Sequence, residues 1–398
     1  MRLARVMRPP TLTLPHKGGG DNNTPLPLRE RSTAQRAGEG CVAGNGGKRR
    51  AETSTWTARC AGLFCLLALF LAGPARAQGL SVAEPLTEAK VVERVTAAVD
   101  RGLAYLASKQ LPDGSWHKNN AVNALALLSF LGRGHTPGRG PYRDVLERGK
   151  KFVLASAKAD TGYLSFSSMY EHGLATLVLA ELYGMDPDAE LEEKLRKAVD
   201  LIVKSQSPSG GWRYNPTPGD QDLSVTVMQI VALRAANNAE IPVPAPTIEK
   251  AIAYVRTCAH AAGGYAYTAG GGPGPQTTAA GILSLQLLGK FDDPSIPKSL
   301  ELLQKYPIKW DTSVQYFYYF HYYAVQASYQ TGGQHWNDWH PKIRELLLAK
   351  QNPDGSWDVP PGSAEANEGV VGPNKVYWTA MGSLILEIYM HFLPAYQR

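Results

Sequence analysis

The sequence contains few of the groups from which proteins build disulfides, metal sites and phosphate-binding loops. Only four of its 398 residues are cysteines, and Cys41, Cys60 and Cys65 all lie within the first 77 residues. A chain that loses those residues keeps Cys258 alone, so its core must be large enough to fold without an internal disulfide. The motifs Gly-x-Ser-x-Gly, the phosphate loop and the dinucleotide fingerprint are all absent, which argues against the enzyme classes that use them.

Sustained period-2 alternation of apolar and polar residues is also missing, which argues against a β-rich fold. The formal net charge of +6 belongs to the N-terminal part of the chain. The first 77 residues hold 12 of the 41 Lys and Arg residues but only 4 of the 35 Asp and Glu residues. The remainder therefore carries 29 basic and 31 acidic residues. This balance indicates no nucleic-acid partner.

Residues 48–77 are typical of a secretory signal peptide. Basic residues open the segment, an apolar core follows at residues 61–72, and Ala75-Arg76-Ala77 provides the small-x-small cleavage motif. The apolar core is about 12 residues long, too short to span a bilayer comfortably, and a retained membrane anchor is the alternative. We expect cleavage near Ala77-Gln78 and export to the periplasm or the outside of the cell.

Residues 1–47 are rich in Pro, Gly and Arg and have no apolar periodicity. A signal peptide normally begins a protein, so we expect translation to start near Val42 or later and this extension, if it is made, to be disordered. The remaining residues, 78–398, are expected to form one domain with its core at about residues 90–395.

A short motif recurs along this domain with a period near 48 residues. Each clear copy has Gln, then Gly four residues later and Trp six residues later, and the three copies are Gln110 to Trp116, Gln206 to Trp212 and Gln351 to Trp357. Degenerate copies place Tyr163, Tyr265 or Trp310 at the tryptophan position. Successive aromatic positions are 47, 49, 53, 45 and 47 residues apart. Six units therefore fill the domain.

Each unit predicts two helices of different character. Before the turn the pattern is amphipathic: Leu191, Leu195 and Ile202 share one face of the third unit, with charged residues elsewhere. After the turn the pattern is apolar nearly all round, as in residues 225–233. A helix that is apolar on every side must be buried on every side. We therefore predict an all-α fold, an (α/α)6 toroid of six helical hairpins in two concentric rings.

The pattern Tyr105-Leu106-x3-Gln110-x3-Gly114-x-Trp116 resembles the glutamine–tryptophan repeat of squalene and oxidosqualene cyclases, whose barrels are α/α toroids. Other stretches, such as residues 170–176 and 277–285, are similar to single-barrel bacterial members of this squalene-cyclase and prenyltransferase superfamily. The resemblance covers about residues 90–395 and implies a fold more specifically than a reaction. We interpret the repeat residues as structural, with Gly allowing the turn and the Gln amide satisfying helix-end groups.

In a toroid of hairpins the inner helices run parallel, so their N-termini meet at one mouth of the barrel. Polar residues just before each apolar helix are therefore the candidates for a site: Asn119, Asn120, Tyr170, Glu171, His172, Asp220, Asp222, Gln276, Thr277, Asp311, Asn374 and Lys375.

Asp222 is the main catalytic candidate. Squalene-type cyclases use an Asp-x-Asp-Asp motif whose middle acid protonates an alkene, and Asp222 in Asp220-Gln-Asp222-Leu223 matches that acid. Leu223 replaces the third Asp. A second carboxylate nearby would raise the upper pKa of the pair, and Asp220 is the candidate for it. The alternative is helix capping, because Asp311-Thr-Ser-Val repeats the pattern of Asp222 and its successors at another expected helix start, where the helix dipole favours the ionised form.

Two further groups have a functional and a structural interpretation. Glu171 and His172 can form an acid–base pair, although neighbours on a helix point about 100° apart, and the alternative for His172 is a satisfied core position. Tyr316, Phe320 and Tyr323 share a helix face and can stabilise a carbocation, with core packing as the alternative. Tyr170 and Tyr377 are further candidates for substrate binding.

Metal and cofactor sites are not expected. Protein prenyltransferases of this superfamily hold zinc with an Asp-x-Cys pair and a distant His, and the sequence has no Asp-x-Cys. Cys258-Ala-His260 and the pair His335 and His340 lack ordinary zinc spacing.

Four classes of function remain. The first is a class II terpene-cyclase-type isomerase acting on a polyprenyl lipid. The second is a non-catalytic barrel that binds an apolar ligand or a protein. The third is a carbohydrate-active barrel, which needs two carboxylates, with Glu171 or Asp222 opposite Asp311. A zinc-dependent prenyltransferase is the fourth. The expected ligand is an apolar lipid or small molecule, with peripheral membrane contact; the sequence predicts no oligomeric state.

Overall fold

The structure is a computed structural model that describes residues 88–367, 375–388 and 390. The predicted extension, signal peptide and cleavage site lie outside these residues, as does Asn374. All the regular elements in the described part are helices, and they are α1 (Glu88–Lys109), α2 (Asn120–Gly132), α3 (Arg143–Ala155), α4 (Met169–Met185), α5 (Ala189–Lys204), α6 (Leu223–Asn238), α7 (Ala245–Thr257), α8 (Pro275–Leu287), α9 (Ile296–Leu303), α10 (Phe317–Thr331), α11 (Gly333–Lys350), the short 3-10 helix η1 (Ala364–Asn367) and α12 (Val376–Glu387).

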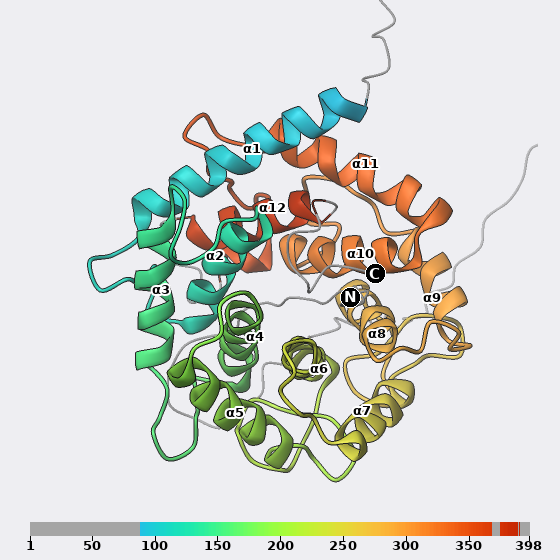
Figure 1. Ribbon diagram of the computed structural model, residues 1–398. Helices are drawn as coiled ribbons and strands as arrows, with labels where there is room; N and C mark the ends of the chain where they lie inside the picture. Colours follow the sequence, from blue (N-terminus) through green and yellow to red (C-terminus); the bar gives the residue numbers. More distant parts are fainter. Residues whose placement is uncertain (1–87, 368–374, 389, 391–398) are drawn as a thin grey trace, which may run out of the picture. The chain divides into compact units, whose positions relative to one another are not determined.

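The α-helices form two concentric rings (Figure 1). The even-numbered helices make the inner ring, in which each packs against the next and α12 returns to α2. The odd-numbered helices lie outside and pack on inner helices, and α1 contacts both α11 and α12, which closes the outer ring. The predicted all-α toroid of six hairpins is therefore confirmed.

Burial distinguishes the two rings as the sequence pattern predicted. In the outer helix α5, Leu191, Leu195 and Ile202 are buried, whereas Glu190 pairs with Lys194 at 2.7 Å on the exposed side. In the inner helix α6, every residue from 223 to 233 is buried. No helix in the described part of the chain is long and apolar enough to cross a membrane.

The repeat motif ties each turn to the next outer helix. In the third unit, the Gln206 amide donates to the carbonyl oxygens of Gly210 and Thr247, each at 2.9 Å. The Trp212 indole donates to the carbonyl of Ile202 at 2.7 Å. Gly210 has a φ of +99°, and a Cβ there would lie 2.1 Å from the carbonyl oxygen of Lys250 in α7. Glycine is required both by this conformation and by this close approach.

The first and last clear copies make the same bonds. Gln110 donates to Gly114 and to Val145 in α3, and Trp116 donates to the carbonyl of Leu106. Trp357 donates to Leu347. Gln351 donates to Gly355 and, at 2.7 Å, to the carbonyl of Ala98 in α1. The last repeat is thereby fastened to the first helix, so the motif that links consecutive hairpins also closes the ring.

Candidate functional site

Tyrosines gather at the end of the barrel where the inner helices begin. Tyr170 in α4 stacks on Tyr214 with ring centroids 5.8 Å apart, and the hydroxyls of Tyr214 and Tyr267 are 2.7 Å apart. Tyr319 in α10 lies close enough to act electrostatically on Tyr170, and Tyr316 on Tyr214. We call these five residues the tyrosine layer. It combines residues from two inner helices, the segment preceding α10 and two connecting loops.

Asp222 lies beside this layer and caps α6. Its side chain is fully buried, and Oδ1 accepts hydrogen bonds from the Val225 amide at 2.9 Å and the Ser224 hydroxyl at 2.6 Å. The capping alternative drawn from the sequence is thus realised in the structure. Capping occupies one carboxyl oxygen and leaves Oδ2 for other contacts.

Burial has the largest effect on the Asp222 carboxyl and raises its pKa above the usual value. The donors around it, including the Arg213 guanidinium and the Tyr267 hydroxyl, limit the rise without reversing it. Burial disfavours the charged form because a charge loses its hydration in a low-dielectric interior. Asp222 is therefore a buried carboxyl that holds its proton more strongly than a carboxyl in water does.

Arg213 is shared between two carboxylates. Its Nη1 lies 2.7 Å from Asp220, and its Nε lies 3.4 Å from Oδ2 of Asp222. The guanidinium also lies over the rings of Tyr214 and Tyr267, at 5.2 and 5.8 Å from their centroids. The Asp220 side chain is 73% exposed. Asp220 therefore pairs with Arg213 at the solvent-exposed side. The pKa of Asp222 is raised by burial and not, as the sequence had suggested, by a second carboxylate.

A chain of hydroxyls leads from the tyrosine layer to the carboxyl of Asp222. The Tyr170 hydroxyl is hydrogen-bonded to the Ser224 hydroxyl, which in turn donates to Oδ1 of Asp222. Tyr170 is 6% exposed. Hydroxyl groups both donate and accept, so this arrangement can pass a proton towards the carboxyl.

Glu171 and His172 are brought to different surroundings. The Glu171 carboxylate accepts from Asn119, Ser165 and the amide of Phe166, and from the Ser167 hydroxyl. It is thereby saturated and organises the loop before α4.

His172 belongs to the interface between α4 and α5. Its Nδ1 accepts from the Leu164 amide at 3.1 Å, and Nε2 lies 3.0 Å from the carbonyl of Ala198. Burial lowers its pKa to about 4, so the ring is neutral near pH 7. These contacts are those of the satisfied core histidine.

The expectation that Asp311 begins an inner helix is wrong. Helix α10 begins at Phe317, and Asp311 instead accepts hydrogen bonds from the amide and hydroxyl of Ser313 in a local turn. These bonds lower the pKa of the Asp311 carboxyl. The four-residue pattern shared with Asp222 therefore marks a helix cap in one case and a turn in the other.

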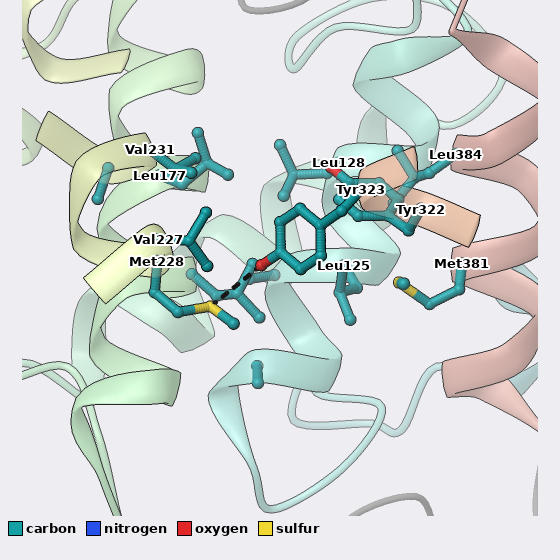
Figure 2. Close-up of a cluster of buried hydrophobic side chains, with 14 of the residues drawn as sticks. Leu125, Leu128, Leu177, Val227, Met228, Val231, Tyr322, Tyr323, Met381 and Leu384 are labelled. Carbon is teal, nitrogen blue, oxygen red and sulfur yellow. Dashed lines mark hydrogen bonds between the residues drawn. The ribbon is translucent and has the colours of Figure 1, made fainter. Parts of the chain in front are cut away.

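The predicted aromatic face of α10 is only partly correct. Tyr323 points into the barrel, where its hydroxyl reaches Met228 of α6 (Figure 2). Phe320 instead packs on Tyr306 and on Trp339 of α11, at centroid distances of 5.7 and 5.6 Å. The tyrosine one turn before Tyr323 is Tyr319, and their ring centroids are 4.8 Å apart.

The remaining candidates have local partners or lie apart from Asp222. Asn119 caps α2 by accepting from the Ala121 amide, and Asn120 donates to Ser156 and Leu164. The Thr277 hydroxyl donates to the carbonyl of Tyr265. Lys375 pairs with Asp358 at 2.7 Å, Tyr377 is fully buried in α12, and Gln276 lies in the first turn of α8.

Sequence reasoning missed Arg213, Tyr214, Tyr267 and Tyr319. A signal existed for two of them, because Tyr214 and Tyr267 each stand two residues after the turn aromatic of their repeat. Corresponding positions in consecutive repeats lie at corresponding places around the ring. Among the described residues, no group of three or more His, Cys, Asp or Glu side chains is arranged to hold a metal ion.

Comparison with known proteins gives one match in sequence. A 141-residue stretch is 30% identical to lanosterol synthase erg7A of Aspergillus fumigatus and covers 32% of this chain and 18% of that enzyme. The chain thus spans less than a fifth of the length of this relative. No protein-family model matches the chain.

Solved structures of similar fold come from several enzyme classes. The type II terpene cyclase MstE from Scytonema, in a variant solved with its substrate geranylgeranyl dihydroxybenzoate, matches with a TM-score of 0.54 over 77% of this chain and 100% of that chain, at 14% identity. Cellobiose 2-epimerase from Spirochaeta thermophila has a TM-score of 0.58 at 13% identity over 77% of this chain and 100% of that one. The α-1,6-mannanase GH76A of Salegentibacter has a TM-score of 0.56 at 10% identity, over 74% of this chain and 98% of that one.

At these identities the structural likenesses show the fold, which all three enzymes have in common. The partial sequence match adds a likeness to lanosterol synthase over 141 residues. The chain therefore has the α/α-toroid fold of these enzymes, and about a third of it is similar in sequence to lanosterol synthase.

Proposed function

We propose that the chain is a class II terpene-cyclase-type enzyme in which Asp222 protonates an alkene of a polyprenyl lipid. The observation that carries this proposal is the fully buried Asp222 carboxyl, whose pKa is raised by burial and which lies beside the tyrosine layer. A general acid needs a carboxyl that is protonated near neutral pH, and burial is the usual way to obtain one.

In the proposed reaction Asp222 donates its proton to one carbon of the alkene. The π electrons form the new C–H bond, and the other carbon becomes a cation. Tyrosine faces stabilise such a cation through the ring quadrupole. Attack by a second alkene closes a ring, and final loss of a proton restores an alkene. The product is then an isomer of the substrate, so the reaction requires no oxidant or reductant.

The hydroxyls of Ser224 and Tyr170 provide a route for returning a proton to Asp222. Arg213 acts in the opposite sense, because its positive charge favours the ionised carboxylate. Its shorter contact is with Asp220, which limits that effect. Leu223 stands where the squalene-type motif has a third Asp, so the acid of this chain relies on burial.

The non-catalytic alternative is a barrel that binds an apolar ligand or a protein, and in it Asp222 would be a helix cap and nothing more. The carbohydrate alternative has weaker support. It needs two free carboxylates facing each other, whereas Glu171 is saturated by hydrogen bonds and Asp311 is engaged with Ser313. Export with peripheral membrane contact remains part of our proposal, since a lipid-binding protein of this kind would meet its ligand at a membrane surface.

Two measurements test the proposed function. The purified full chain should carry a lipid that mass spectrometry identifies as a polyprene, and it should convert that lipid to a cyclic isomer. Asp222→Asn keeps an oxygen that can cap α6 but cannot supply the acid proton. We expect it to bind the lipid and to lose turnover by at least about 10²-fold, the usual contribution of a general acid. Equal turnover by both proteins would refute the catalytic role, and absence of any bound or converted polyprene would refute the ligand.

A further inference from the structure

Helix α10 begins without a cap of its own. Its N-cap residue is Tyr316, whose side chain makes no capping hydrogen bond. An N-cap side chain normally accepts from the amide of the second or third helical residue, and in α10 these are Tyr318 and Tyr319. Both residues are buried, so their amides need partners within the protein. By contrast, α2 and α6 are capped by the residues directly before them, Asn119 and Asp222.

Glu365 supplies the missing cap from the connection between α11 and α12. This residue lies in η1, and its side chain is fully buried. Its Oε2 accepts from the Tyr318 amide at 3.1 Å and its Oε1 from the Tyr319 amide at 3.0 Å, from 47 and 46 positions along the chain. A negative charge is also favoured at the positive end of a helix dipole. One carboxylate thus satisfies two amides at the start of α10.

The segment that carries Glu365 is itself fixed to the residues before α10. The Ser363 hydroxyl and the Ala364 amide both donate to the carbonyl of Gln315, at 3.1 and 3.0 Å. At the start of the same connection, Asp358 pairs with Lys375 at 2.7 Å, directly before α12. These contacts hold the carboxylate in place against the helix that it caps.

Tyr319 depends on this cap more than other members of the tyrosine layer do. The hydroxyls of Tyr214 and Tyr267 are hydrogen-bonded to each other, and that of Tyr170 is bonded to a serine of α6. The Tyr319 hydroxyl is buried and makes no hydrogen bond within the described part of the chain. Its ring is therefore held by packing and by its backbone, and its backbone amide is one of the two that Glu365 binds.

We infer that Glu365 is a positioning residue, which fixes the first turn of α10 and thereby keeps Tyr319 in the tyrosine layer near Asp222. The inference rests on the proposed function for the reaction that this ring serves. A ring that stabilises a cation must already be held where the cation forms. Because such an interaction is made in the transition state, its loss lowers kcat and leaves KM nearly unchanged.

The test compares the wild-type full chain with Glu365→Ala and a matched control, Asp188→Ala. Glu365→Ala removes both acceptors from the start of α10. Asp188 caps the outer helix α5 by accepting from the Leu191 amide at 2.8 Å, and it also pairs with Lys150. The control therefore loses a helix cap and an ion pair without touching α10. Loss of a cap shifts a local equilibrium by about tenfold.

The first measurement needs no ligand and follows nitration of single tyrosines by tetranitromethane, located by mass spectrometry. Tyr319 and Tyr170 are 7% and 6% exposed, so each reacts only when the structure around it opens. In Glu365→Ala we expect Tyr319 to react about tenfold faster and Tyr170, which a hydroxyl bond holds, to react as in the wild type. In Asp188→Ala neither rate should change.

The second measurement is the steady-state turnover of geranylgeraniol, a linear polyprenyl alcohol. In Glu365→Ala we expect kcat to fall at least about tenfold while KM stays within about threefold, and the control should keep both values. If circular dichroism shows that Glu365→Ala is unfolded, Glu365→Gln takes its place. Glutamine keeps one acceptor oxygen, so the same changes should appear at about threefold.

The outcomes separate the inference from the proposed function. An unchanged nitration rate of Tyr319 means that packing alone holds the ring, and equal increases for Tyr319 and Tyr170 mean that Glu365 stabilises the whole barrel; either result refutes the inference. A more reactive Tyr319 with unchanged kcat refutes its link to the reaction. A wild type that turns over no polyprene refutes the proposed function, and selective nitration of Tyr319 then still decides whether Glu365 positions that ring.

Discussion

The stability of Asp222 variants as a function of pH tests the physical basis of the proposed acid. The comparison is between the wild type, Asp222→Asn and Asp222→Ala. Alanine removes the acceptor for the Val225 amide and the Ser224 hydroxyl, and loss of a helix cap costs about 1–2 kcal/mol. Asparagine retains a capping oxygen, so it should cost about 1 kcal/mol less than alanine.

The pH dependence follows from the direction of the pKa shift. Burial raises the pKa of Asp222 in the folded protein, so the folded state binds a proton more tightly than the unfolded state. The resulting contribution to stability is complete below the unfolded value near 3.8 and is lost as pH rises through the folded value. Each tenfold change between the two dissociation constants is worth about 1.4 kcal/mol.

The assay is urea unfolding, followed by circular dichroism, of the wild type and Asp222→Asn at pH 4 and pH 7. Asparagine does not titrate, so the wild type should lose stability relative to this variant on going from pH 4 to pH 7. Working with the difference between two proteins removes the contributions of other titrating groups that both share. A wild type that gains relative stability over this interval would mean that its carboxylate is favoured by Arg213 and the helix end, and the reasoning about the acid would fail.

Three further predictions concern the turn, the shared arginine and the core histidine. Gly210→Ala should lower the free energy of unfolding, measured by urea titration, by about 2 kcal/mol or more, because its Cβ would meet the Lys250 carbonyl at a positive φ. Gly219→Ala is the control, because open space surrounds that position, and it should have little effect. Asp220→Asn should release Arg213 towards the buried acid, lower the pKa of that acid and move the pH profile of turnover to lower pH; an unmoved profile would contradict the sharing of Arg213. His172→Gln should reduce the loss of stability below about pH 6.5. The neutral ring contributes stability that disappears as the pH falls from the unfolded pKa of 6.5 towards the folded pKa of about 4. A variant that loses as much stability in acid as the wild type would count against this prediction.

The fold was predictable because its signals repeat. An aromatic residue recurs at each turn, and the three clear copies add a Gln and a Gly. In these copies the Gln amide bonds to the next outer helix, as from Gln206 to Thr247, and the Trp indole bonds to the preceding one, as from Trp212 to Ile202. The alternation of one-sided and all-round apolar helices then requires two rings. Six copies of a single rule were enough to specify the architecture.

The site was less predictable for a physical reason. An inner helix that is apolar on every side carries no sign of which face looks into the barrel, so Phe320 and Tyr323 were assigned together although they point to different rings. Arg213 lies in the same loop as Asp222, and Tyr267 lies in the corresponding loop of the next repeat, so contacts within one loop and between adjacent hairpins bring them to Asp222. Asp222 could be identified because it caps α6, and the repeat had already predicted where that helix begins.

The bond from Gln351 to Ala98 joins residues that are 253 positions apart. In an open solenoid the end units need special capping sequences, because each has a bare face. In this molecule every hairpin has two neighbours, and the last interface can form only after all six hairpins have been arranged. Most native contacts are local and form early, whereas this final one carries a large loop-closure entropy. A chain lacking one hairpin would leave two bare faces at once, so assembly of the ring should be nearly all-or-none.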